Sequence, residues 1–416
     1  MSSTQAESTP GHDWVRAHQF QIGAYNDVPA DMEEYKSFGF TAYLGGIRLS
    51  HMSEERVERV MTPAVEAGLD VHWFTWYRPG EKEQFIEAEQ FLRERVAPIG
   101  YSIGDENRIE QLEELGPVLE HARQAAPDAL IYHALRGKDF PEFADDPEVY
   151  VNYMDTVAEQ LRPDMMMFNM YPFYRGTIAD FFYDNLERVR DQALASNVPY
   201  WNWLQAFAWT EGPFHSPSES EIRLQAFVSL AYGYSGLFYW KYIASYEPYA
   251  HGMLDYEEKP TPSAEYIRDI VPELKHIGEV VKDLTSTSVH FVPGRRYRDG
   301  EWHNVLPIGV TAFKRGQHPF VLDVQSSNRR GAVLGTFRDD DGNAYFMIVN
   351  GNHGADLSAA ETAAAVSLRF RPRVDGVERL NRQTGEYEAV PLDNHTLSHY
   401  VLPGGTGDLF RIVQKP

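Results

Sequence analysis

The chain has 416 residues, a length that predicts two or three domains. It carries 38 Lys and Arg against 61 Asp and Glu, a formal net charge of −23, so it lacks the basic character needed to bind nucleic acid or an anionic membrane surface. Apolar residues make up 43% and charged residues 24%, which are globular values, and without cysteine the chain can form neither disulfides nor thiolate metal sites.

No apolar run is long enough to cross a membrane, and residues 1–11 are polar, without the apolar core of a signal peptide. We therefore expect residues 1–18 to form a flexible N-terminal tail. This pattern leaves the location open, because a cytoplasmic protein would look the same as a secreted one whose signal peptide is absent from this chain.

Residues 19–285 alternate eight times between a short apolar, aromatic run and an amphipathic stretch. The runs predict strands and the stretches predict helices. The expected strands are Phe20–Tyr25, Thr41–Ile47, Asp70–Trp76, Gly100–Gly104, Leu130–Ala134, Met165–Met170, Tyr200–Phe207 and Gly236–Tyr242. The expected helices include Glu54–Ala67, Glu83–Val96, Ile109–Ala125, Val149–Leu161, Ile178–Ala195 and Glu219–Tyr232, the last opened by a capping-box pattern at Ser218–Glu221.

This alternation predicts that residues 19–285 form a (β/α)8 barrel, the TIM-barrel fold, because the number of units and the length both fit. A doubly wound parallel sheet would alternate in the same way. Such a sheet would need a glycine-rich phosphate loop after its first strand, where this chain has Tyr25-Asn-Asp-Val-Pro29. The sequence therefore favours the barrel and disfavours nucleotide or phosphosugar chemistry.

Residues 286–416 have a different pattern, with short alternating runs separated by Gly, Asn and Asp turns and with no long helix predicted. The runs are Val289–Val292, Phe320–Val324, Gly331–Phe337, Ala344–Val349, Ala365–Phe370 and Leu409–Val413. Short strands at such spacing are typical of an antiparallel β-sandwich. We expect a β-sandwich accessory domain after the barrel.

Residues at the C-terminal ends of barrel strands are the candidates for a substrate site, because barrel enzymes place their chemistry there. Here these positions combine polar groups that suit hydroxyls with aromatic rings that suit the apolar faces of a sugar. The candidate substrate-binding residues are Asp27, His51, Trp73, Trp76, His133, Arg136, Asn169, Tyr171, Gln205, Trp240, Lys241 and Tyr242. The histidines lack metal-site spacing, so the sequence implies no metal and no cofactor.

The adjacent carboxyl groups of Asp105 and Glu106 are the sharpest feature of the sequence. They follow the buried-looking run Ile99–Gly104. A carboxylate at the mouth of an apolar barrel is partly desolvated, which raises its pKa toward the range of a general acid. In the alternative interpretation the pair only caps a helix that begins near Asn107. We favour catalysis by Glu106, with Asp105 orienting a substrate hydroxyl.

Three short stretches accompany the expected fourth, sixth and eighth strands, namely Gly100-Tyr-Ser-Ile-Gly-Asp-Glu106, Asp164-Met-Met-Met-Phe-Asn-Met-Tyr-Pro172 and Ala231-Tyr-Gly-Tyr-Ser-Gly-Leu-Phe-Tyr-Trp240. With them, residues 19–285 resemble the barrels of clan A glycoside hydrolases, in particular β-galactosidase-like (family 42-like) barrels followed by a β-sandwich. The resemblance implies an acid/base Glu after strand four and a nucleophilic Glu after strand seven. Glu106 matches the first position. Gln205 stands at the second, and an amide cannot form a glycosyl ester.

Because Gln205 stands where the resemblance implies a nucleophilic Glu, three interpretations of the site remain. In the first, the second catalytic carboxylate comes from a nearby loop, with Glu211, Glu247 and Asp255 as candidates, and a distant carboxylate would activate water and invert the anomeric centre. In the second, the register is shifted and Glu211 is the nucleophile. In the third, the chain binds sugars without cleaving them or cleaves them by another route.

We therefore expect a glycoside hydrolase that cleaves an oligo- or polysaccharide by carboxylate acid/base catalysis, with a carbohydrate as its partner. A non-catalytic glycan-binding barrel is one alternative. A polysaccharide lyase is another, in which Arg136 and Lys241 would neutralise a uronate and Tyr171 would act as the base. The sequence does not identify the sugar, and it leaves the oligomeric state open, with a homo-oligomer among the options.

Overall fold

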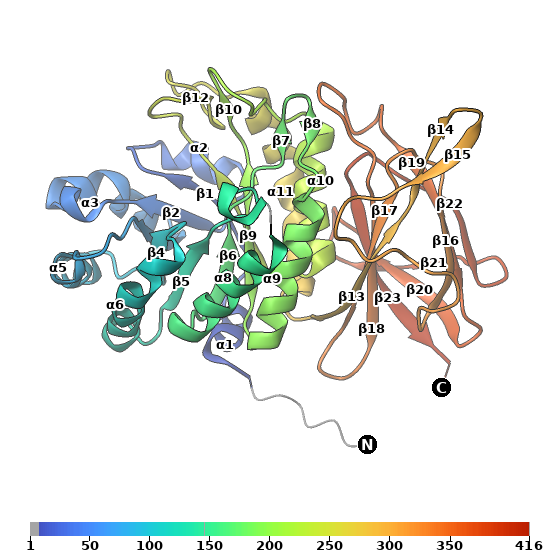
Figure 1. The fold of residues 1–416 in the computed structure, drawn as a ribbon, viewed down its shortest axis with the longest axis horizontal. Coiled ribbons are helices and arrows are strands. Elements are labelled where there is room, and N and C mark those ends of the chain that lie inside the picture. Colours follow the sequence, from blue (N-terminus) through green and yellow to red (C-terminus); the bar gives the residue numbers. More distant parts are fainter. Residues whose placement is uncertain (1–7, 145, 416) are drawn as a thin grey trace. The chain divides into compact units, whose positions relative to one another are not determined.

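The computed structural model describes residues 8–144 and 146–415, which form two compact units (Figure 1). The first unit contains the residues up to 170 together with 188–203 and 235–245. The second contains residues 171–187, 204–234 and those from 246 onward. Residues 1–7, which belong to the expected flexible tail, lie outside the described residues.

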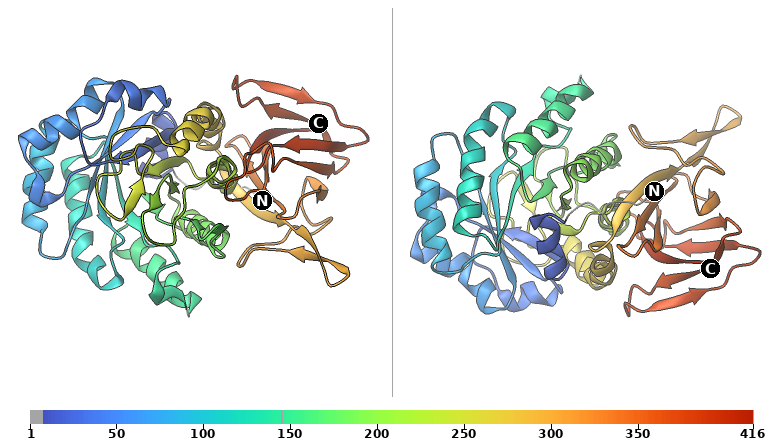
Figure 2. Two further views of the ribbon diagram at one scale, coloured as in Figure 1. Left: turned by 90° about the horizontal axis from the view of Figure 1, so that it is seen from above. Right: turned by 90° about the horizontal axis from the view of Figure 1, so that it is seen from below.

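A closed barrel of eight parallel strands forms the centre of the first unit, and Figure 2 shows it with the blue and teal helices outside it. Around the barrel the strands run in the order β1, β11, β9, β6, β5, β4, β3 and β2. Each overlaps one of the eight strands expected from the sequence, so the prediction of a (β/α)8 barrel is confirmed. Their bounds are β1 (Gln21–Asn26), β2 (Ala42–Gly46), β3 (Asp70–Thr75), β4 (Gly100–Asp105), β5 (Leu130–Leu135), β6 (Met165–Phe168), β9 (Tyr200–Gln205) and β11 (Gly236–Trp240).

The helices that follow the strands obey local sequence signals. Asp31 caps α2 and Ser53 caps α3 by accepting hydrogen bonds from backbone N–H groups of the first turn. The expected helix Glu54–Ala67 is divided into α3 and α4 because Pro63, which has no N–H to donate, fits only the first turn of a new helix. The helices are α2 (Met32–Ser37), α3 (Glu54–Val60), α4 (Thr62–Glu66), α5 (Lys82–Arg93), α6 (Leu112–Ala125), α7 (Pro141–Ala144), α8 (Pro147–Gln160) and α9 (Phe182–Ser196), with 3₁₀ turns η1 (Leu49–His51) and η2 (Ile109–Gln111).

Helix α1 (Pro10–Ala17) lies in the segment for which the sequence analysis expected a flexible tail. Its first turn contains Pro10 and Asp13, both suited to a helix N-terminus. Trp14 and Val15 are buried, and the ring of Trp14 lies 5.8 Å from that of His72 on β3. The helix is only two turns long, so its apolar residues are too few for a periodic pattern to reveal it.

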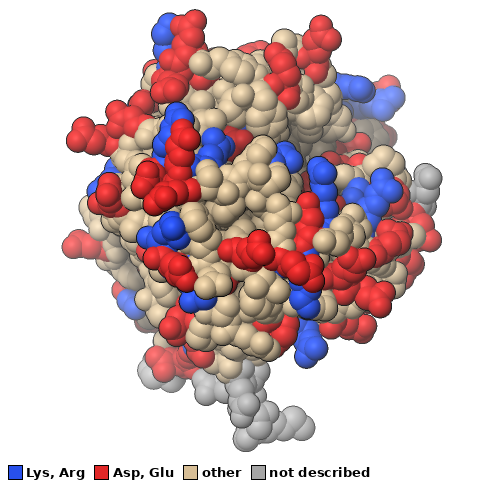
Figure 3. Space-filling model, turned by 90° about the vertical axis from the view of Figure 1, so that its left-hand side faces the viewer, with Lys and Arg blue, Asp and Glu red and all other residues tan. Residues whose placement is uncertain are grey.

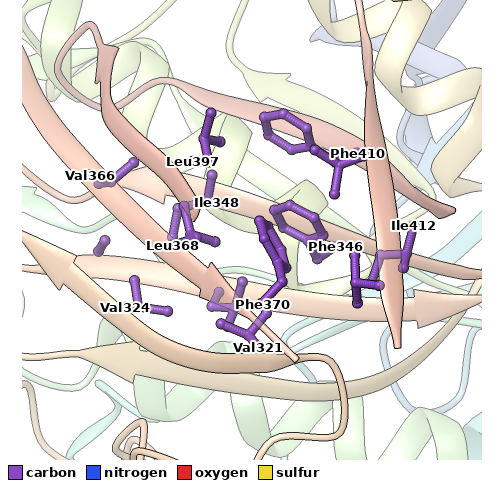
Figure 4. Close-up of a cluster of buried hydrophobic side chains, with 14 of the residues drawn as sticks. Val321, Val324, Phe346, Ile348, Val366, Leu368, Phe370, Leu397, Phe410 and Ile412 are labelled. Carbon is purple, nitrogen blue, oxygen red and sulfur yellow. The ribbon is translucent and has the colours of Figure 1, made fainter. Parts of the chain in front are cut away.

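Two antiparallel sheets enclose the core of the second unit, which confirms the expected β-sandwich. The larger sheet has the strand order β13, β17, β18, β23, β20, β21, and the smaller has the order β16, β19, β22. Apolar side chains of both sheets meet between them, as Figure 4 shows for Phe346, Phe370 and Phe410. The strands are β13 (Thr285–Val292), β16 (Val321–Ser326), β17 (Ala332–Arg338), β18 (Ala344–Asn350), β19 (Ala364–Phe370), β20 (Val374–Leu380), β21 (Tyr387–Val390), β22 (Thr396–Leu402) and β23 (Gly407–Gln414).

Two long helices, α10 (Glu219–Tyr232) and α11 (Pro262–Val281), pack against each other in the second unit, and α10 also packs on β17 and β18. The expected capping box is present, since Ser218 and Glu221 satisfy each other's backbone N–H groups. Gly335 of β17 lets α10 approach, because a Cβ there would meet the carbonyl oxygen of Ala231 at 1.8 Å. Short strands paired in twos complete the unit: β7 (Phe173–Tyr174) with β8 (Thr177–Ile178), β10 (Ala208–Trp209) with β12 (Tyr249–His251), and β14 (Gly294–Arg298) with β15 (Glu301–Val305).

The acidic balance of the sequence is visible on the surface. Figure 3 shows acidic side chains spread over one face among scattered Lys and Arg. In the part of the chain that the structure describes, no helix is both long and apolar enough to span a membrane. Within that same part, no three His, Asp or Glu side chains gather in a way that could hold a metal ion.

Candidate active site

The chain turns sharply at the end of β4, and this turn places Asp105 and Glu106. Gly104 has a φ of +78°, and a Cβ there would lie 2.4 Å from Oδ1 of Asn107 and 3.1 Å from Nδ1 of His133. Glu106 itself has a φ of +51°, in the left-handed region that residues with side chains seldom occupy. Backbone strain of this kind is often found at functional sites, and several other residues with side chains adopt it in the described part of the chain.

Asn169, which follows β6, bridges the two carboxyl groups. Its Nδ2 donates to Oδ1 of Asp105 at 3.1 Å and to Oε1 of Glu106 at 3.2 Å. Trp76, which follows β3, donates its indole N–H to Oδ2 of Asp105 at 3.1 Å. Residues from the ends of three strands therefore fix the orientation of this carboxyl pair.

The surroundings raise the pKa of both carboxyl groups. Burial is the largest cause for Glu106, and the charge of the neighbouring Asp105 raises its pKa further. Burial also raises the pKa of Asp105, but hydrogen bonds from Trp76 and Asn169 favour its charged form. Glu106 thus has the more strongly raised pKa and keeps a proton near neutral pH, which is the protonation state a general acid needs.

Two arginines support the turn. Arg136 donates from Nη1 to the carbonyl oxygen of Glu106 at 2.8 Å, and its Nη2 pairs with Glu142 at 2.8 Å. The guanidinium of Arg48 lies over the ring of Trp76, 4.4 Å from its centroid. Arg136 therefore holds the backbone of Glu106, and Arg48 covers one face of the indole that donates to Asp105.

A second polar cluster joins the ends of β1 and β11. Nζ of Lys241 lies 2.7 Å from Oγ of Ser245 and 3.4 Å from Oδ1 of Asp27, and Ser245 donates to Asp27 at 2.9 Å. The Lys241 side chain is fully buried, and burial lowers its pKa although Asp27 raises it. In the strand order, β11 stands four places from β4, so this cluster and Glu106 belong to opposite sides of the barrel.

Only some of the predicted aromatic residues lie near these groups. Trp240 stacks on Tyr25 with ring centroids 4.2 Å apart. Trp73 is fully buried, donates its indole N–H to the carbonyl oxygen of Ile47 and stacks on Phe85 of α5. Tyr242 is also buried, with its ring 4.9 Å from Tyr35 of α2. Trp73 and Tyr242 thus pack between barrel and helices.

The two predicted histidines differ in burial. His133 is buried beside the end of β4, where its Nδ1 donates to the carbonyl oxygen of Ile103 at 2.9 Å. Burial lowers the pKa of His133 to about 4, so the ring is neutral. His51 ends η1 and is exposed. Neither histidine contacts the carboxyl pair in the described residues, although His133 packs under the turn that carries it.

Four candidates belong to the second unit. Gln205 is fully buried, and all its amide contacts go to the main chain: Oε1 accepts from Phe173 N–H, and Nε2 donates to the carbonyl oxygens of Phe173, Phe207 and His215. Tyr171 packs edge-on against Phe207 at 4.9 Å. Glu211 and Glu247 are exposed, and Glu247 accepts a hydrogen bond from Thr210 at 3.2 Å. Because the hydrogen bonds of the Gln205 side-chain amide go to the main chain, this side chain stabilises the segments around Phe173, Phe207 and His215.

Arg48, Asn107, Tyr25 and Ser245 take part in the site but were not among the predicted residues. Asn107 is buried and donates to the carbonyl oxygen of Tyr77 at 3.2 Å, which holds the turn after Glu106 in place. Its position directly after Glu106 is a signal that could have found it. Ser245 has no comparable signal, because only the folded loop after β11 brings it to Asp27.

Comparisons with known proteins support the fold. No protein-family model and no curated protein matches the sequence. Among solved structures, a glycoside hydrolase of family 5 from Bacteroides vulgatus matches with a TM-score of 0.56 at 12% identity, over 95% of this chain and 89% of that one. A protein described as a glycoside hydrolase matches with a TM-score of 0.55 at 13% identity, over 95% and 93%. A beta-galactosidase from the psychrophilic Marinomonas ef1 has a TM-score of 0.47 at 10% identity over 64% of this chain, which spans 62% of that enzyme. The chain therefore has a barrel-and-sheet fold that glycoside hydrolases also have.

Proposed function

We propose that the protein is a glycoside hydrolase that cleaves an oligo- or polysaccharide, with Glu106 as the general acid. The observation that carries this proposal is the carboxyl pair at the end of β4, in which burial and Asp105 raise the pKa of Glu106. The strained backbone of Glu106 and its hydrogen bond from Asn169 support a fixed direction for the proton. The fold shared with glycoside hydrolases supports the same class of reaction.

In the proposed reaction, Glu106 gives its proton to the glycosidic oxygen as the bond from that oxygen to the anomeric carbon breaks. The departing sugar leaves as an alcohol, and Glu106 becomes a carboxylate. Asn169 is suited to stabilise this carboxylate, because its Nδ2 already donates to Oε1. Asp105 would orient a sugar hydroxyl and keep the pKa of Glu106 high until the proton is transferred.

A second carboxylate must complete the reaction, and Glu211 and Glu247 are the proposed candidates. Both side chains are exposed, so each is open to a water molecule. A base would remove a proton from water as the water attacks the anomeric carbon, giving inversion, whereas a nucleophile would form a glycosyl ester, giving retention. Asp27 is a weaker candidate, because it already accepts from Ser245 and pairs with Lys241.

A non-catalytic glycan-binding protein is the second candidate function. The observation in its favour is Gln205, whose amide replaces a carboxylate after β9 and is saturated by the main chain. The alternative hypothesis of a polysaccharide lyase required Arg136 and Lys241 to neutralise a uronate. Arg136 instead pairs with Glu142 and Lys241 pairs with Asp27, which disfavours this hypothesis.

The test is cleavage of a broad panel of plant and microbial polysaccharides, measured as released reducing sugar. We compare the wild type with Glu106→Gln and with Glu113→Gln, a matched change at an exposed position of α6. Cleavage that falls by at least about a hundredfold in Glu106→Gln alone supports the proposal. Equal activity of the two variants excludes Glu106 as the acid, and binding of a glycan without any cleavage supports the second candidate.

The second carboxylate can be identified with Glu211→Ala and Glu247→Ala on the substrate found. The variant that lacks the nucleophile or base should lose activity and recover it when azide is added, because azide can attack the anomeric carbon in place of the missing group. Full activity in both variants excludes both candidates and points to Asp27 as the next residue to replace.

A further inference from the structure

The second unit contains a cavity of about 700 Å³ that the proposed function does not use. Its walls come from the start of α9, from the hairpin β14–β15 and the chain that follows it, and from the turns after β16 and β18. Pockets of about 300–1,000 Å³ are typical of small-molecule sites, so this cavity has the size of a small-molecule site. All of these segments belong to the second unit.

The cavity is positively charged, which is unusual in a chain with a net charge of −23. Arg296, Arg329 and Arg330 line it, together with a single acidic residue, Asp180. Within residues 8–144 and 146–415, none of the three guanidinium groups has a carboxylate partner. An unpaired guanidinium presents a planar fork of donors that matches a carboxylate.

The turn that carries two of these arginines is rigid. The side chain of Asn328, which is buried, accepts from the backbone N–H groups of Arg330 and Gly331 and donates to the carbonyl oxygen of Gly331. Gly331 has a φ of +86°, and a Cβ there would lie 2.2 Å from the carbonyl oxygen of Val292. Arg329 and Arg330 are therefore held on a preorganised support, as in a built binding site.

His353 also lines the cavity, and one of its ring nitrogens lacks a hydrogen-bond partner in the described structure. It is buried, and its Nδ1 donates to the carbonyl oxygen of Gly351 at 2.9 Å. Its Nε2 is buried and lacks a hydrogen-bond partner in the described structure. Burial and Arg330 lower the pKa of His353 to about 3, so Nε2 carries a lone pair that can accept from a ligand hydroxyl.

Aromatic and apolar side chains form the lip of the cavity. Tyr297 and Ile308 are each 60% exposed, and Leu306 is 42% exposed. Such exposed apolar groups around a concave site mark a binding surface, and a tyrosine ring suits the apolar face of a sugar. Tyr183 lies deeper, is buried, and packs edge-on against Phe291 at 5.2 Å.

We infer that this cavity binds a carboxylated sugar, such as a uronate residue of an acidic oligosaccharide. The arginines would take the carboxylate, Nε2 of His353 and Asp180 would accept from hydroxyls, and Tyr297 would cover a ring face. The net charge of −23 repels long polyanions, so a short acidic sugar segment with few charges fits better than nucleic acid or a heavily sulfated chain. This inference adds a second sugar site to the protein and does not depend on Glu106.

The test is isothermal titration of full-length protein with a galacturonate trisaccharide and a glucuronate trisaccharide. Glu106→Gln is used beside the wild type so that cleavage does not consume the ligand. We expect at least one trisaccharide to bind, its carboxyl-reduced neutral form to bind at least tenfold more weakly, and Arg330→Gln to weaken binding at least tenfold. The matched control is Arg369→Gln, an exposed arginine of β19 outside the cavity, which should leave the affinity unchanged.

Tyr297→Ala provides an independent variant at an exposed position, where the fold is not at risk, and should weaken binding severalfold. Equal binding of the neutral trisaccharide, an equal effect of Arg369→Gln, or no binding of either uronide at millimolar concentration would overturn the inference. Inorganic phosphate that binds as tightly as the uronide would also overturn it, since the site would then be a general anion site. If no uronide binds while Glu106-dependent cleavage is intact, the inference about the cavity is wrong and the proposed function is unaffected.

Discussion

Glu106 combines a left-handed backbone with a raised pKa, and both properties depend on its immediate neighbours. Sequence reasoning could find it because it directly follows an apolar strand. Asn169 was also among the predicted strand-end residues, but its hydrogen bond to Glu106 could not be predicted, since 63 residues separate the two and only the barrel brings the ends of β4 and β6 together. Trp76 donates its indole N–H to Asp105 while Arg48 covers one face of its ring, and its predicted stacking on a substrate stays a prediction.

The pH dependence of activity should report the influence of Asp105 on Glu106. The negative charge of Asp105 raises the pKa of Glu106, so Asp105→Asn lowers that pKa and Glu106 loses its proton at a lower pH. We therefore expect the alkaline limb of the kcat/KM profile to move to lower pH in the variant. Measurement of the profile on the identified substrate checks this, and an unmoved limb would show that another group sets it.

Glu106 should also make the stability of the protein fall as the pH rises. The unfolded chain releases this proton near the ordinary pKa of Glu, whereas the folded protein holds it to higher pH, so ionisation favours the unfolded state. Glu106→Gln cannot ionise, and should raise the free energy of unfolding at pH 8 by at least about 1 kcal/mol, since one pKa unit corresponds to about 1.4 kcal/mol.

The difference between Glu106→Gln and the wild type should shrink toward zero near pH 4, where the group is protonated in both states. Denaturant unfolding at several pH values checks this dependence. The exposed control Glu113→Gln should show no such trend, and a difference that stays constant with pH would contradict the proposed cause.

Among the strands, those with a long apolar run could be predicted from the sequence and those without one could not. The barrel strands were found because strands buried on both faces form continuous apolar runs; every residue of β1, β2, β5 and β6 is buried. Hairpin strands such as β14 (Gly-Arg-Arg-Tyr-Arg) and the largely exposed β21 were missed, because their pairing partners define them rather than their composition.

The turn after β4 should tolerate no side chain at Gly104, because this glycine fixes the position of Glu106. Gly104→Ala places a side chain at a φ of +78° and within 2.4 Å of Asn107, so the turn must shift and carry Glu106 with it. We expect kcat/KM to fall at least about tenfold, because small misplacements of a reacting group are costly. Gly68→Ala is the matched control: its φ is +76°, but nothing lies within 4 Å of the added Cβ.

Thermal unfolding separates the effect of backbone strain on stability from the effect of a displaced Glu106 on activity. Both variants should lose about 1–2 kcal/mol of stability from the strained backbone, Gly104→Ala should lose more because its Cβ also meets Asn107, and only Gly104→Ala should lose activity as well. Equal activity of the two variants would contradict a positioning role for the turn.

At the scale of the whole molecule, composition predicted which partners are excluded, but it could not show where the remaining positive charge gathers. The sequence analysis assigned no role to the arginines at 295–298 and 329–330, since nothing in their spacing indicates a common site. Folding brings Arg296 of β14 and the neighbours Arg329 and Arg330 of the turn after β16 to one cavity. These positive charges are apart in the sequence, and they meet at one cavity only because of the way the strands pair in the folded domain.

The net charge of −23 should make stability depend on salt. Like charges spread over the surface repel one another in the folded state, and salt screens this repulsion, with a Debye length of about 10 Å at 0.1 M. We therefore expect the midpoint of thermal unfolding at pH 8 to rise as sodium chloride is increased from about 0.01 M to 0.5 M. The rise should be much smaller at pH 5, near the isoelectric point of about 5.0, where little net charge remains to be screened. A midpoint that falls with salt at pH 8 would instead mean that screened ion pairs, such as Arg223 with Glu273 and Arg382 with Asp408, outweigh the general repulsion.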